Sequence, residues 1–196
     1  MPAARVRSTR ALFAGLAIAV LVVVAAGVLF FGRNTDSEDG DRAAPAGEVV
    51  LEAEGLGFVQ GDSGSSIAHL PFGTDRADVL RSLAASVGEP SEVSEVEECP
   101  FGPAVVADFT TGLSVTFGDG ELVGWSVQAP STHTTAAGIG AGSSLAEVKD
   151  VYAGTTVEAT SLGWEFTAGE IYGVVSGSDP DDEVLHLFGG DNCIFR

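Results

Sequence analysis

The stretch Gly73-Thr-Asp-Arg-Ala-Asp-Val-Leu-Arg-Ser-Leu83 has a counterpart 69 positions later, Gly142-Ser-Ser-Leu-Ala-Glu-Val-Lys-Asp-Val-Tyr152. A second pair follows in the same order and 49 positions apart, Phe117-Gly-Asp-Gly-Glu-Leu-Val-Gly124 and Phe166-Thr-Ala-Gly-Glu-Ile-Tyr-Gly173. Two ordered matches indicate a duplicated structural unit. Because the offset falls from 69 to 49, the first copy holds twenty extra residues between its matched blocks, and Cys99 lies among them.

Each copy opens with a predicted helix. Asp75 with Asp78, and Ser144 with Glu147, stand where side-chain oxygens cap free backbone N–H groups. Apolar residues follow at helical spacing, which predicts that one side of each helix faces a sheet. These residues are Val79, Leu80 and Leu83 in the first copy and Leu145, Val148 and Tyr152 in the second. We expect the helices to end at Gly88-Glu89-Pro90 and at Gly154.

Short β-branched and aromatic runs separated by turn residues predict strands after each helix and before the first. The runs are 49–51, 56–59, 105–109, 113–117, 122–127, 155–159, 162–167, 171–176 and 184–188. The pair Asp119-Gly120 is a strong hairpin signal, and residues 60–66 are predicted to form a loop. The sequence therefore predicts an α+β fold of two tandem helix-plus-antiparallel-sheet repeats, residues 48–130 and 131–196, behind an N-terminal transmembrane helix.

The N-terminal region predicts that helix. An uninterrupted run of apolar and small residues from Ala11 to Gly32 would form a helix of roughly 33 Å, enough to span the lipid bilayer. Three arginines precede it, so residues 1–10 are expected in the cytoplasm as a short tail. Residues 33–47 are expected to be a flexible acidic linker to an extracytoplasmic domain, and the localisation to be a single-pass cell-membrane protein. A cleaved signal peptide ending near Val24-Ala25-Ala26 stays open as the alternative.

Charge and cysteine content agree with an exterior domain. The formal net charge is −19, and a surface of that sign repels nucleic acid. It either keeps the domain soluble or favours a cationic partner. The two cysteines, Cys99 and Cys193, are expected to form a disulfide, as exported cysteines most often do. Such a crosslink between distant positions would stabilise the fold by roughly 4–5 kcal/mol.

No motif predicts catalysis or a bound metal or cofactor. Gly61-Asp-Ser-Gly64 is similar to the nucleophile motif of chymotrypsin-type proteases, but no histidine precedes Ser63, so a turn is expected. His69, His133 and His186 stand apart in sequence, without zinc-ligand spacing. Residues 179–183 lack the pattern of a calcium loop and are expected to form a surface turn, although bound calcium there stays open.

Trp125 and Trp164 recur at hairpin positions of the two copies. Core packing is one interpretation. An exposed aromatic binding surface on the sheet is the other, and it makes both residues candidate contacts for a partner.

The layout resembles tandem helix-then-sheet proteins such as β-lactamase inhibitory protein and the single unit of SmpA/OmlA-type outer-membrane lipoproteins. It is more similar still to membrane-anchored or secreted actinobacterial envelope proteins. The shared motifs are Gly55-Leu-Gly57, Phe72-Gly-Thr74, Cys99-Pro100, Phe117-Gly-Asp-Gly120, Gly124-Trp125, Gly138-Ile-Gly-Ala-Gly-Ser143 and Gly189-Gly-Asp-Asn-Cys193. These motifs are turns and caps, so the resemblance implies a fold and no activity.

Together these observations predict a membrane-anchored, extracytoplasmic, non-catalytic binding or scaffolding module. Its partner is expected to be a protein or another envelope component. An inhibitor of an extracellular enzyme is the alternative, by analogy with the inhibitory protein alone. A hydrolase without a recognisable motif is a more remote one.

Overall fold

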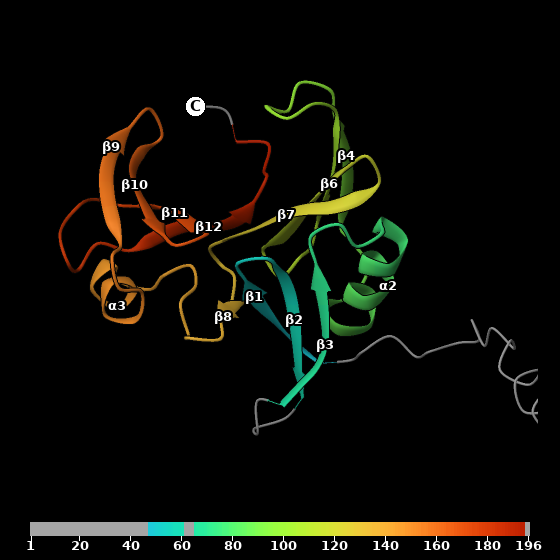
Figure 1. The fold of residues 1–196 in the computed structure, drawn as a ribbon, viewed down its shortest axis with the longest axis horizontal. Coiled ribbons are helices and arrows are strands. Elements are labelled where there is room, and N and C mark those ends of the chain that lie inside the picture. Colours follow the sequence, from blue (N-terminus) through green and yellow to red (C-terminus); the bar gives the residue numbers. More distant parts are fainter. Residues whose placement is uncertain (1–46, 61–64, 195–196) are drawn as a thin grey trace, which may run out of the picture. The chain divides into compact units, whose positions relative to one another are not determined.

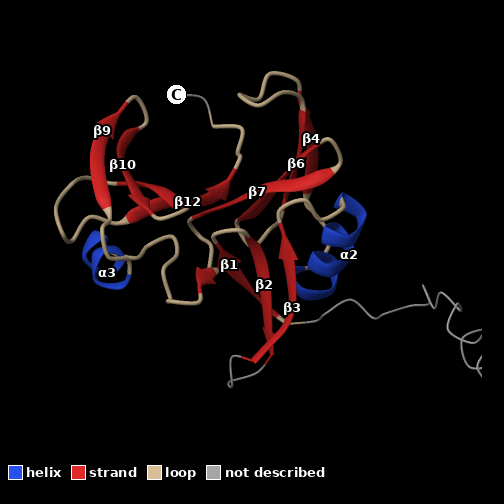
Figure 2. Ribbon diagram, viewed as in Figure 1, coloured by secondary structure: helices blue, strands red, loops and turns tan. Residues whose placement is uncertain are grey.

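The computed structural model describes residues 47–60 and 65–194, which belong to one compact unit. In it, 49% of the residues lie in strands and 13% in helices (Figures 1 and 2). The predicted α+β fold of two tandem helix-plus-sheet repeats is therefore wrong, because the molecule is mostly β-sheet. Two sheets and two helices account for the regular structure of the described residues. The predicted strands near 49–51 and 56–59 are confirmed.

One sheet has eight antiparallel strands in the order β4-β5-β6-β7-β12-β11-β10-β9. Their bounds are β4 Glu92–Val96, β5 Ala104–Asp108, β6 Leu113–Gly118, β7 Glu121–Gln128, β9 Thr156–Thr160, β10 Gly163–Ala168, β11 Ile171–Val175 and β12 Val184–Gly190. Short turns join β5 to β6, β6 to β7, β9 to β10 and β10 to β11, whereas longer loops, 97–103 and 176–183, join β4 to β5 and β11 to β12. The predicted turn Asp119-Gly120 has positive φ at both residues, 51° and 86°, as a two-residue hairpin requires.

Pairing of β7 with β12 joins the two four-stranded halves into this one sheet. Ser126 lies opposite Phe188, and Trp125 lies opposite Gly189. Gly189 has no side chain because the indole of Trp125 occupies that space, 2.7 Å from where a Cβ would stand. The predicted separate sheets therefore do not exist as separate units. This pairing joins segments about sixty residues apart, so local sequence patterns carry no sign of it.

A smaller sheet has the order β3-β2-β1-β8, with bounds β1 Glu48–Glu52, β2 Gly55–Gln60, β3 Ser65–Pro71 and β8 Thr134–Thr135. It combines both predicted repeats, since β1, β2 and β3 lie before residue 130 whereas β8 lies beyond it and runs parallel to β1. The indole N–H of Trp125 donates a hydrogen bond of 2.7 Å to the backbone carbonyl of Glu52, which ties the small sheet to β7.

Helices α2 (Arg76–Val87) and α3 (Leu145–Val151) begin where the sequence predicts. The Asp75 side chain accepts a hydrogen bond from the backbone N–H of Ala77 at 2.8 Å. Ser144 and Glu147 form a reciprocal capping box at the start of α3. Each helix buries the apolar side that the spacing predicted, Val79 and Leu83 in α2 and Leu145 and Val148 in α3.

The helices and the small sheet pack against one face of the eight-stranded sheet, and their buried side chains form one hydrophobic core with it. We call the opposite face the free face. Among the described residues only the loop 97–103 and residues 191–194 lie over it (Figure 1). Its central side chains, read from the strand register, are Val106, Asp108, Ser114, Thr116, Ser126, Gln128, Glu165, Thr167, Tyr172, Val174, His186 and Phe188.

No helix among the described residues combines the length and the apolar character needed to cross a bilayer. The predicted localisation as a single-pass cell-membrane protein is therefore not supported and is corrected here. The segments on which it rested, residues 1–10, 11–32 and most of 33–47, lie outside the described residues.

Candidate functional site

The centre of the free face carries an aromatic cluster on two neighbouring strands. Tyr172 of β11 and Phe188 of β12 are directly opposite each other and stack with ring centroids 5.9 Å apart. His186, two residues before Phe188 on the same face, lies 5.5 Å from the Phe188 ring. Cross-strand aromatic pairs of this kind stabilise a sheet. Here they also place large apolar side chains on the free face, where Phe188 is 5% exposed and Tyr172 is partly exposed.

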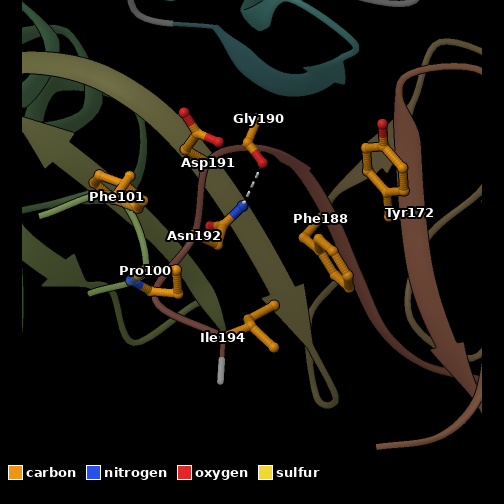
Figure 3. Close-up of a pocket in the computed structure, with 8 residues that line it drawn as sticks. All are labelled: Pro100, Phe101, Tyr172, Phe188, Gly190, Asp191, Asn192 and Ile194. Carbon is orange, nitrogen blue, oxygen red and sulfur yellow. Dashed lines mark hydrogen bonds between the residues drawn. The ribbon is translucent and has the colours of Figure 1, made fainter. Parts of the chain in front are cut away.

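A cavity of about 650 Å³ opens at this cluster. We call it the aromatic cavity; its lining residues are Pro100, Phe101, Tyr172, Phe188, Gly190, Asp191, Asn192 and Ile194 (Figure 3). The sheet supplies Tyr172 and Phe188 as its floor. The loop after β4 supplies Pro100 and Phe101, and the chain after β12 supplies the remaining wall.

A disulfide between Cys99 and Cys193 fastens these two walls to each other. One cysteine lies in the twenty residues that only the first copy contains, and the other lies in the chain after the last strand. Asn192 is held as well, because its side-chain amide donates to the backbone carbonyls of Gly189 (3.0 Å) and Gly190 (3.3 Å). Since structural disulfides persist mainly in oxidising compartments, the bond is compatible with an extracytoplasmic location.

A smaller cavity of about 370 Å³ adjoins the first. We call it the acidic pocket; its lining residues are Ala53, Glu54, Phe72, Glu170, Tyr172, Gly190 and Asp191. It shares Tyr172, Gly190 and Asp191 with the aromatic cavity. Three exposed carboxylates therefore border the aromatic cluster on one side.

Cationic side chains lie elsewhere. Among the described residues, Arg76 and Arg81 are on α2 and Lys149 is on α3, and both helices belong to the layer on the covered side of the sheet. Burial lowers the pKa of His186 below its usual value, so its imidazole is neutral at pH 7. The free face and its cavities thus present only neutral and negative groups within the described structure.

The two tryptophans proposed as a binding surface do not form one. Trp125 is completely buried on the covered face, because its indole fills the core above Gly189. Trp164, on β10 near the end of the sheet, is 38% exposed. The aromatic residues that do line a cavity, Tyr172 and Phe188, were not predicted from the sequence. The alternation Ile171-Tyr172-Gly173 and Leu187-Phe188-Gly189 places both on one face, but which face stays uncovered cannot be read from that pattern.

The other candidate residues are dispersed. His69 contacts the Glu52 carboxylate at 2.5 Å, and His133 is buried with its Nε2 3.0 Å from the Thr111 hydroxyl. No three His, Cys, Asp or Glu side chains in the described ranges are arranged to hold a metal ion. Residues 179–183 form a turn in which the Asp182 carboxylate accepts the backbone N–H of Asp179 at 2.8 Å. Ser63 lies outside the described residues.

Comparison with protein-family models, with curated proteins and with solved structures finds no match to this chain. Function must therefore be argued from the chemistry of the site. A concave, aromatic, disulfide-bordered cavity on the uncovered face of a sheet is suited to holding another molecule.

Proposed function

We propose that this protein is a non-catalytic, extracytoplasmic binding module that holds a partner protein or envelope component on the free face of its eight-stranded sheet. The observation that carries the proposal is the aromatic cavity formed by Tyr172 and Phe188 beneath the disulfide-fixed loop. Its volume lies within the range of about 300–1,000 Å³ usual for ligand sites.

The composition of the face supports the same proposal. Partner surfaces concentrate binding energy in a few aromatic anchors surrounded by polar positions. On the free face, Thr167 and Ser126 flank the Tyr172–Phe188 pair on the neighbouring strands, and Ser114 lies one strand beyond Ser126. Both walls of the cavity are covalently joined, so little conformational freedom is lost when a partner binds.

An inhibitor of an extracellular enzyme is the second candidate, and one observation favours it. Residues Cys99–Gly102 form a tight turn, closed by a 3.0 Å hydrogen bond from the Gly102 N–H to the Cys99 carbonyl. The disulfide fixes this turn, and Phe101 on it is 38% exposed. A rigid loop that presents one aromatic side chain is able to occupy a pocket of another protein.

The test compares which partners are retained by the purified full-length wild-type protein and by a variant whose aromatic cavity has been removed. Phe101→Ala with Tyr172→Ala removes two of the side chains that line the cavity. Asp150→Asn with Glu89→Gln, exposed positions on the helical side, serves as the control. We expect one partner that wild type and control retain and the cavity variant loses. Equal retention by all three would contradict the proposal. Inhibition of the retained partner's own activity would favour the inhibitor.

A further inference from the structure

We infer that the partner presents a cationic peptide segment, with an apolar side chain in the aromatic cavity and a lysine or arginine beside it at the acidic pocket. This inference deepens the proposed function and rests on it. The two cavities share one wall, formed by Tyr172, Gly190 and Asp191. An occupant of the first therefore lies directly against the second.

The three carboxylates of the acidic pocket have no cationic partner among the described residues. Within the described residues, the ion pairs at 4.0 Å or less join His69 to Glu52 and Arg81 to Asp78. Glu54, Glu170 and Asp191 are all exposed and take part in neither. A lysine or arginine brought to the pocket would thus meet three carboxylates without displacing an internal ion pair.

The distribution of charge over the fold gives an independent reason. All three cationic side chains of the described structure, Arg76, Arg81 and Lys149, lie on the two helices, on the side away from the free face. Within the described residues, an anionic segment would therefore find no cation near the aromatic cavity. Because potentials across an interface are usually complementary in sign, the partner segment is expected to be positive.

The aromatic cluster then decides which kind of cationic segment fits. Carboxylates alone attract any cation weakly, since exposed pairs contribute little. Tyr172, Phe188 and Phe101 add an apolar cavity large enough for an aromatic or branched side chain. The exposed ring of Phe101 and the partly exposed ring of Tyr172 also offer faces near which a cation is stabilised. A segment with both groups adjacent uses both cavities, which simple salts and polyamines do not.

The experiment selects short random peptides displayed on phage against the full-length protein and discards those that also bind the Phe101→Ala/Tyr172→Ala variant. We expect the remaining peptides to combine an aromatic or branched apolar residue with lysine or arginine. Cavity-dependent peptides that are neutral or acidic would overturn this inference and leave the proposed function standing. If no peptide depends on the cavity, both are overturned.

A second measurement fixes the place of the cation. The affinity of the enriched peptide is compared between wild type, Asp191→Asn/Glu170→Gln, and the control Asp150→Asn/Glu89→Gln. The pocket variant is expected to weaken binding roughly three- to tenfold and to reduce its salt dependence, while the control leaves both unchanged. Equal weakening in pocket variant and control would show attraction to overall negative charge and would overturn the inference.

Discussion

Replacing Cys99 and Cys193 by serine removes the crosslink between the two walls of the aromatic cavity. The bond closes a loop of 94 residues that contains most of the eight-stranded sheet. In the chain-entropy description, a closed loop of this length destabilises the unfolded state by about 4.7 kcal/mol. The double variant should therefore lose about that much of its free energy of unfolding, which corresponds to a fall in Tm of roughly 10–20 °C for a unit of this size.

The variant should still fold, because the strand pairing and the core do not depend on the bond. The segment after β12 also keeps other contacts. The backbone N–H of Asp191 donates to the Val123 carbonyl at 2.8 Å, and the Asn192 amide donates to Gly189 and Gly190. The loop that carries Phe101 has less to hold it. The loop that carries Phe101 should therefore become mobile when the bond is removed, and peptide binding at the cavity should weaken even though the segment after β12 stays in place.

The assay is urea unfolding of wild type and variant, followed by circular dichroism, with reduced wild type as a third sample. Reduced wild type and the serine variant should unfold at the same urea concentration, well below oxidised wild type. A loss smaller than about 1 kcal/mol, with equal dependence on urea, would refute the loop-closure reasoning. Unchanged peptide binding in the variant would refute the role of the bond in shaping the cavity.

A Cβ at Gly124 would lie 2.0 Å from the Asp191 carbonyl oxygen, so Gly124→Ala should lower the free energy of unfolding in urea by about 1–3 kcal/mol. Gly118→Ala is the near-neutral control, because a Cβ there meets only side-chain atoms, at 3.4 Å or more. Equal losses in the two variants would contradict the steric argument. His186 should titrate by NMR with a midpoint below 6.5. Between that midpoint and pH 6.5 the unfolded state binds more protons, so His186 makes stability fall as pH falls through this window; a midpoint at or above 6.5 rules this out. Trp125→Phe should lose about 1–3 kcal/mol of stability and retain the partner, because the indole is in the core; a folded variant that loses the partner would place Trp125 at the site.

Local features of this protein were predictable where short-range chemistry determines them. Asp75 and Ser144 cap helices at the predicted positions, and Asp119-Gly120 makes the predicted hairpin. Each depends on residues within four positions, so the sequence pattern contains the whole cause. The pairing of Cys99 with Cys193 was predictable for a different reason, since the sequence contains two cysteines and each has only the other as a possible partner.

The fold class was not predictable in this way. The halves looked like separate helix-and-sheet units because each has its own capped helix and hairpins. Pairing of β7 with β12 turns them into one sheet, and β8, two residues long, completes a second sheet beside β1. Both pairings join segments far apart in the chain, where no periodicity or turn signal links the partners.

The sequence by itself determined where helices cap, where the chain turns and which side chains alternate along each strand, because these follow from neighbouring residues. Only the tertiary structure decided which face of the sheet the helices and the small sheet would cover. That choice buried Trp125 and left Tyr172 and Phe188 on the free face. The physical reason is that an alternating strand offers two faces, and burial is assigned to one of them only when distant elements pack against it.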